Sequence, residues 1–60
     1  MTLRKVFKKF EYARRPYHYG VVFYVAEEEK FFWQDDRDGH DRPYNMTLED
    51  VLATDWLGIE

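Results

Sequence analysis

The chain has 60 residues, of which 45% are hydrophobic and 20% aromatic, and it carries a formal net charge of −3 with no cysteine. This length predicts one domain over residues 1–60. The lack of cysteine excludes disulfides and thiolate metal sites, and two histidines make a structural zinc site improbable. Stability must then come from aromatic burial or from a partner subunit. We expect a homo-oligomer, because a chain this short cannot hide all of its two Trp, five Tyr and five Phe rings.

The charge is divided unevenly along the chain. Residues 1–15 hold six basic groups and one acid, whereas residues 16–60 hold three basic groups and eleven acids. This division indicates either an anion site near the N-terminus or attraction between the two halves, within the fold or across an oligomer. The sequence pI of about 5.3 argues against an extended nucleic-acid track.

The N-terminal third predicts a helix followed by an extended segment. A helix is expected over 3–10, because apolar residues recur there at i, i+3, i+4 and i+7: Leu3, Val6, Phe7 and Phe10. Thr2 is placed to cap this helix. The segment 12–15 is expected to be extended, since Pro16 disfavours helix at the residue before it. Residues 16–20 read as a turn that Gly20 closes.

The middle of the chain predicts a hairpin and a loop. The β-branched and aromatic run 21–26 predicts a central strand. The charged link 27–29 is short, so a second strand over 30–34 should pair with it in antiparallel fashion. Residues 35–45 are expected to form a surface loop, with a turn at Asp38 and Gly39.

The C-terminal segment predicts a capped helical turn and a last strand. Thr47 and Asp50 are spaced as a capping box, and Met46 and Val51 as a hydrophobic staple across it. A strand is expected over 54–59. The order α-β-β-β-α-β predicts an α+β fold with a small antiparallel sheet, or a partly open barrel, of about four strands. The expected core comprises Phe7, Val22, Tyr24, Phe32, Leu52, Trp56 and Ile59, with Val51 also facing inward.

Catalytic constellations are missing from the sequence. It has no serine and no cysteine, so neither a Ser-His-Asp nor a Cys-His arrangement is available. One acidic cluster does not match the spacing of an EF-hand, and it is expected to be a solvated loop: Asp35, Asp36, Asp38, His40 and Asp41. We therefore expect a binding protein that is not an enzyme and uses neither metal nor cofactor.

One segment combines planar cations with aromatic rings, and it supplies the candidate ligand site: Arg14, Arg15, Tyr17, His18 and Tyr19. Guanidinium groups bind phosphate through two hydrogen bonds, and aromatic faces stack on nucleobases. A phosphate-bearing nucleotide is the expected ligand, with Arg15 facing it because Arg15 adjoins the turn. The alternative is that the arginines pair with the acidic half and the rings pack in the core.

The sequence also bears on location. Residues 1–10 are basic and amphipathic, and they lack the continuous apolar stretch of a signal peptide. The longest apolar run, 21–26, is far shorter than the ~20 residues of a membrane span. We expect a cytoplasmic protein without membrane contact.

Two stretches resemble a known family. The ending LEDVLATDW, over 48–56, is similar to the closing signature of a phage family associated with the second type of Thoeris anti-defence protein, and YARRPY, over 12–17, is similar to its Arg-bearing strand. The resemblance implies a compact, mainly β fold that oligomerises and sequesters a cyclic nucleotide or an ADP-ribose-derived immune signal in the host cytoplasm. A phage inhibitor that blocks a host protein through an acidic, aromatic-rich surface remains the alternative.

Overall fold

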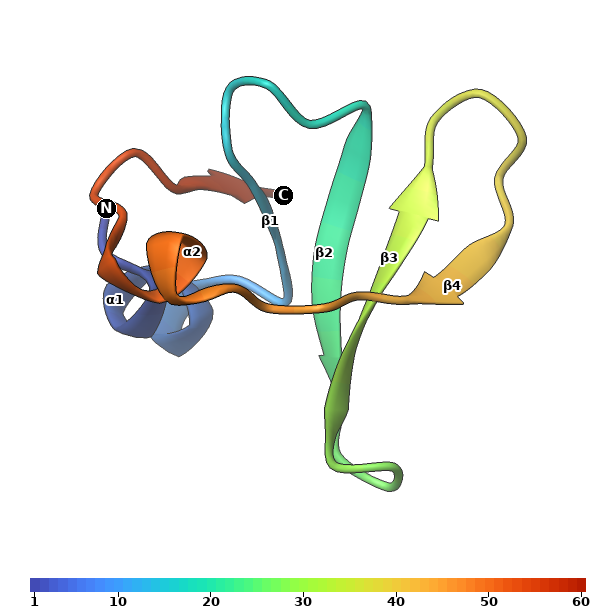
Figure 1. The fold of residues 1–60 in the computed structure, drawn as a ribbon, viewed down its shortest axis with the longest axis horizontal. Helices are drawn as coiled ribbons and strands as arrows, with labels where there is room; N and C mark the ends of the chain where they lie inside the picture. Colours follow the sequence, from blue (N-terminus) through green and yellow to red (C-terminus); the bar gives the residue numbers. More distant parts are fainter.

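The computed structural model describes residues 1–60 and contains two short helices and one five-stranded antiparallel sheet (Figure 1). The elements are α1 (Leu3–Lys9), β1 (Tyr12–Arg14), β2 (Gly20–Val25), β3 (Lys30–Asp35), β4 (Asp41–Pro43), α2 (Leu48–Leu52) and β5 (Leu57–Ile59). The strand order is β4-β3-β2-β1-β5, so β2 is central and the sheet does not close. The predicted α+β class is confirmed, with one strand more than expected. Neither helix is long and apolar enough to cross a membrane.

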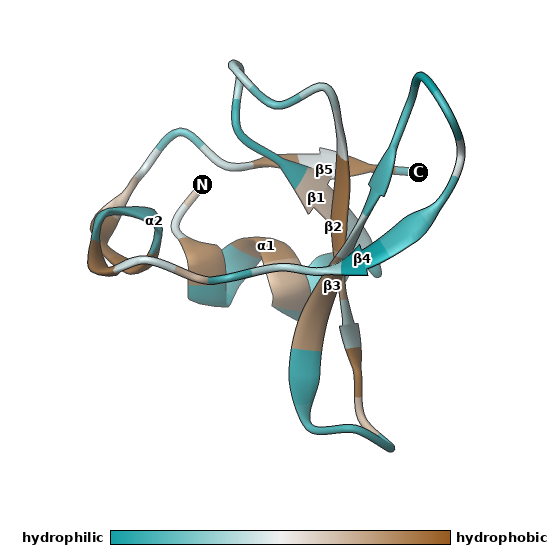
Figure 2. Ribbon diagram, turned by 45° about the vertical axis from the view of Figure 1, so that its right-hand side comes forward, coloured by the Kyte–Doolittle hydropathy of each residue, from teal (hydrophilic) through white to brown (hydrophobic).

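The first helix forms as its apolar stripe predicts. The Thr2 hydroxyl accepts a hydrogen bond from the Lys5 backbone N–H, which caps the helix start. The helix ends at Lys9, one residue earlier than predicted, because Phe10 adopts an extended conformation that leads into β1. Its inward face carries Val6, which is fully buried, and it lies against β1 and β5 and beside α2 (Figure 2).

The segment predicted as one loop over 35–45 contains a strand, and this prediction was wrong. Residues Asp41–Pro43 form β4 and pair with β3, with Trp33 opposite Arg42. Figure 2 shows that β4 is hydrophilic while β2 is hydrophobic. A polar, proline-containing segment is tolerated as a strand at the edge of a sheet, where its outer backbone groups face water.

The second helix has the predicted cap but presents a different face inward. The Thr47 hydroxyl accepts from the Asp50 backbone N–H at 3.1 Å, and the Asp50 carboxylate accepts from the Thr47 backbone N–H at 3.3 Å. Val51 and Leu52, predicted to face inward, are 47% and 71% exposed. In this five-residue helix the inward position is taken by the capping carboxylate of Asp50, which is 2% exposed. The last strand starts at Leu57 and not at residue 54.

The core lies on the face of the sheet that the helices cover. Four apolar residues are fully or almost fully buried there: Val6, Ala13, Val22 and Trp56. Trp56 is the largest of them, as predicted, and its indole N–H donates to the Asp50 carbonyl at 2.9 Å. The predicted burial of Tyr24 and Leu52 was wrong, since both side chains are exposed.

Candidate functional site

Three of the five predicted site residues line one open cavity. Tyr17, His18 and Tyr19 lie on the loop between β1 and β2, and they form part of the wall of a cavity of about 410 Å³. The rest of this aromatic cavity is formed by residues of β3, β4 and the segment after β4: Trp33, Pro43, Tyr44 and Asn45. Neither Arg14 nor Arg15 lines it, although the Arg15 guanidinium carbon lies 4.9 Å from the centroid of the Tyr17 ring.

The side chain of Arg15 points to the C-terminal segment. Its Nη1 donates to Asp50 Oδ1 at 2.9 Å and its Nε donates to Asp55 Oδ1 at 2.8 Å. The same Nη1 donates to the Tyr17 hydroxyl at 3.1 Å. Hydrogen bonds to Asp55 and Asp50 raise the pKa of Arg15 above its ordinary value. Arg15 therefore joins the loop after β1 to α2 and to the segment that leads into β5.

Asp50 is the acceptor at the centre of this network. Its Oδ2 accepts from the Tyr44 hydroxyl at 2.7 Å, and its Oδ1 accepts from Arg15 and from the Tyr17 hydroxyl at 3.2 Å. Burial opposes the ionisation of Asp50, but hydrogen bonds from Tyr44, Arg15 and Thr47 outweigh it and lower the pKa of this carboxyl to about 2. Asp50 is accordingly a carboxylate at neutral pH.

His18 connects this network to the aromatic cavity. Its Nδ1 accepts from the Arg15 backbone N–H at 3.0 Å, so the neutral ring carries its proton on Nε2. Nε2 lies 3.1 Å from the Tyr44 hydroxyl and can donate to it, because Tyr44 in turn donates to Asp50. Burial lowers the pKa of His18, which keeps the ring neutral. The ring also packs edge-on against Trp56, with centroids 5.8 Å apart.

Arg14 lies on the opposite face of the sheet from the core. Ala13 is fully buried on the helix-covered face, and side chains alternate along a strand, so Arg14 points to the other side. Its Nε is buried without a hydrogen-bond partner within the chain. Arg15, which was expected to face the ligand, pairs with Asp50 and Asp55, whereas Arg14 forms no ion pair within the chain.

A second cation beside the cavity, Arg37, was not predicted from the sequence. The Arg37 guanidinium carbon lies 5.2 Å from the centroid of the Tyr19 ring. Its Nε and Nη2 donate to the buried Asp35 carboxylate at 3.0 and 2.8 Å. Trp33 and Tyr44 were not predicted either. Trp33 is positioned by the pairing of β3 with β2, and Tyr44 by the pairing of β3 with β4.

Comparisons with protein-family models, with curated proteins and with solved structures find no match. No group of three or more His, Cys, Asp or Glu side chains is placed to hold a metal ion. The groups at the aromatic cavity can stack on a ring, form hydrogen bonds through the Asn45 amide and pair with a negative charge through Arg37.

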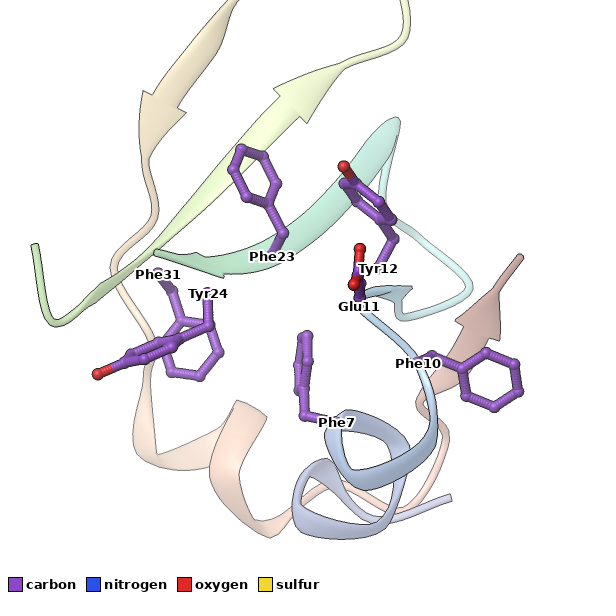
Figure 3. A pocket seen from close by; sticks show the side chains of 7 residues that line it. All are labelled: Phe7, Phe10, Glu11, Tyr12, Phe23, Tyr24 and Phe31. Carbon is purple, nitrogen blue, oxygen red and sulfur yellow. The ribbon is translucent and has the colours of Figure 1, made fainter. Parts of the chain in front are cut away.

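A second and larger cavity, of about 660 Å³, lies between α1 and the β2–β3 hairpin (Figure 3). One acidic side chain and six aromatic side chains line it: Glu11, Phe7, Phe10, Tyr12, Phe23, Tyr24 and Phe31. Figure 3 shows Phe23 and Tyr12 projecting on one side of β2, away from Phe7. This cavity contains none of the predicted site residues and no basic side chain, so it does not suit a phosphate-bearing ligand.

Proposed function

We propose that this chain is a non-enzymatic binding protein that sequesters a nucleotide-derived signalling molecule of the cyclic-nucleotide or cyclic ADP-ribose type. The observation that carries the proposal is that five aromatic rings line one open cavity: Tyr17, His18, Tyr19, Trp33 and Tyr44. Base stacking on such rings contributes roughly 1–3 kcal/mol per base and tolerates different bases. The neutral His18 and the occupied Tyr17 hydroxyl favour stacking over proton transfer.

The phosphate of this ligand is assigned to Arg37. Its fork to Asp35 uses Nε and Nη2, so Nη1 can still donate to a phosphate oxygen. The Arg37 side chain is 72% exposed and lies over the Tyr19 ring, at the side of the aromatic cavity. A base stacked on Tyr19 would therefore place its phosphate within reach of a guanidinium.

The biological setting is proposed from the family resemblance. The two stretches that resemble the anti-defence family meet in the structure, because Arg15 of the first pairs with Asp50 and Asp55 of the second. The contacts of these motif residues stabilise the fold beside the cavity. We propose a self-associating phage counter-defence protein that acts in the host cytoplasm and removes its ligand from solution without cleaving it.

Calorimetry with a matched pair of tyrosine variants tests this function. Tyr19 and Tyr24 are both exposed, at 67% and 49%, but only Tyr19 lines the aromatic cavity. With cyclic dinucleotides, cyclic trinucleotides and cyclic ADP-ribose isomers as probes, Tyr19→Ala should weaken the binding of one ligand at least tenfold, as expected for a lost stack. Tyr24→Ala should leave that affinity unchanged. The proposal fails if no probe binds the wild type at about 100 µM, or if both variants lose affinity equally.

A second function is favoured by one observation. The turn Glu27–Glu29 is exposed at the end of the β2–β3 hairpin, close to the exposed Tyr24, and no guanidinium lines the aromatic cavity. An acidic turn beside an aromatic side chain suits a rim that contacts a basic surface of a host protein. Absence of nucleotide binding by a folded wild-type chain would favour this inhibitor function.

A further inference from the structure

The face of the sheet opposite the helices carries two rows of side chains, set by the strand register. The first row runs across all five strands: Leu57, Arg14, Val21, Gln34 and Asp41. The second row also runs across all five strands: Ile59, Tyr12, Phe23, Phe32 and Pro43. We name these ten positions the open face. None of their side chains packs against the buried core.

The open face is too apolar for a sheet surface that meets water. Tyr12 and Leu57 are 42% and 47% exposed. The ring of Phe23 lies 5.6 Å from that of Tyr12 and 6.2 Å from that of Phe32, which makes a continuous aromatic row. Antiparallel sheets that face solvent usually carry polar side chains on that face, and an apolar face is usually covered by a second layer.

We propose that a second copy of the chain covers the open face, sheet against sheet, about a two-fold axis that passes over Phe23. Because β2 is the central strand, an axis parallel to it places β1 of one copy over β3 of the other. Tyr12 then meets the partner's Phe32, and Ile59 meets the partner's Pro43. Two sheets packed in this way lie about 10 Å apart and share one apolar core.

The charges on the open face are complementary under the same rotation. Arg14 on β1 and Asp41 on β4 share one row but lie on opposite sides of β2. Under this rotation Arg14 lies over the partner's Gln34 and one strand, about 4.8 Å, from the partner's Asp41. The symmetric pair forms at the other end of the row. Neither Arg14 nor Asp41 forms an ion pair within the chain. Each copy thus supplies the counterion that the other lacks.

The size of the open face also fits a second copy. A stable interface buries about 800 Å² per partner, which is less than a fifth of the 4576 Å² surface of this chain. The largest side of a molecule that measures 27 × 25 × 23 Å is of comparable size. Most of the aromatic cavity lies outside the interface, because Trp33 alternates with Phe32 and points to the other side of the sheet, and only Pro43 belongs to both. Dimer formation and ligand binding can therefore be measured separately.

A charge-swap experiment tests the inference on the full chain by sedimentation equilibrium. The wild type should be a dimer at about 50 µM, and Arg14→Asp or Asp41→Arg alone should each weaken dimerisation at least tenfold through like-charge repulsion. The double variant Arg14→Asp/Asp41→Arg should recover dimerisation, because the pair is restored with its signs reversed. The matched control Arg42→Asp, which lies on the other face of β4, should remain dimeric.

A second variant keeps the test decisive if a charge swap disturbs folding. Phe23→Glu places two carboxylates beside each other on the proposed axis, so it should give a monomer with an unchanged circular-dichroism spectrum. A monomeric wild type would overturn the inference. So would a dimer that survives both Arg14→Asp and Phe23→Glu, or a folded double variant that stays monomeric.

Discussion

Asp50 is the residue on which the local structure depends most. One carboxylate completes the cap of α2, accepts from two tyrosine hydroxyls and balances the charge of Arg15. All of these contacts need its ionised form, and its side chain is 3% exposed. A buried charge pair of this kind contributes little net free energy, but removing one partner leaves the other uncompensated. The second acid bound to Arg15, Asp55, is 46% exposed and is better solvated.

This contrast predicts different costs for two neutralising substitutions. Asp50→Asn should lower the melting temperature by more than about 10 °C, because it leaves the Arg15 guanidinium without its buried counterion. Asp55→Asn should lower it by a few degrees only, since water can replace an exposed carboxylate. Thermal denaturation followed by circular dichroism at pH 7 measures both. Equal shifts for the two variants would show that Asp50 has no special role.

At the scale of elements, local patterns predicted α1, the β2–β3 hairpin and the α2 cap, because each depends on residues close together in the sequence. Strand β4 was missed, since Asp41, Arg42 and Pro43 have low strand propensity and pair only because β3 offers them a free edge. The inward face of α2 was not predicted, because the apolar side chains of Val51 and Leu52 were expected to be buried in preference to a carboxylate. A helix of five residues is positioned by its cap instead.

The aromatic cavity was predictable only in part. Tyr17, His18 and Tyr19 are consecutive, so their proximity follows from the sequence. Trp33 and Tyr44 reach them through strand pairing, and the pairing register cannot be read from composition. Arg15 was expected to face the ligand because it adjoins the turn. The two acids that bind its side chain are 35 and 40 residues away in the sequence, so neighbouring residues could not predict this pairing.

The close approach of β2 and β3 gives a prediction at this scale. A Cβ placed on Gly20 would collide with the backbone carbonyl of Gln34, which cannot move without opening the sheet. Gly20→Ala should therefore destabilise the chain by about 3 kcal/mol in urea denaturation. Gly39→Ala is the control, because space around Gly39 is free and only its positive φ of 69° opposes a side chain, at a cost of about 1 kcal/mol. The two glycines would prove equivalent if both variants had the same urea midpoint.

For the whole molecule, the uneven charge of the sequence has a limited role within one chain. Arg15 is the only basic residue of the first fifteen that forms an ion pair, and it reaches Asp50 and Asp55 in the acidic part. The other two ion pairs join residues that both lie in the acidic part, as in Arg37 with Asp35. Ion pairing between the two parts is thus confined to Arg15. Arg14 remains able to pair with a group outside the chain.

Acid should weaken the fold in two stages, because folding favours the neutral form of His18 but the ionised forms of Asp35 and Asp50. Burial lowers the pKa of His18 below its usual 6.5. Below pH 6.5 the unfolded chain therefore binds a proton that the folded chain rejects, and the free energy of unfolding falls. Hydrogen bonds from Arg37 lower the pKa of Asp35 from 3.8 to about 2, and those to Asp50 lower its pKa to about 2 as well. Their stabilisation is present above pH 3.8 and is lost as the pH falls towards 2.

Urea midpoints between pH 8 and pH 2 measure these stages. The wild type should be most stable above pH 6.5, lose some stability as the pH falls below 6.5, and lose most of it below pH 3.8. His18→Gln should remove the first stage and keep the second, because only the imidazole titrates near pH 6.5. His40→Gln is the matched control, since His40 is exposed, and it should retain both stages. A midpoint that rises from pH 6.5 to 5 in the wild type would mean that folding favours protonated His18, which contradicts its Nδ1 acting as acceptor for the Arg15 backbone N–H.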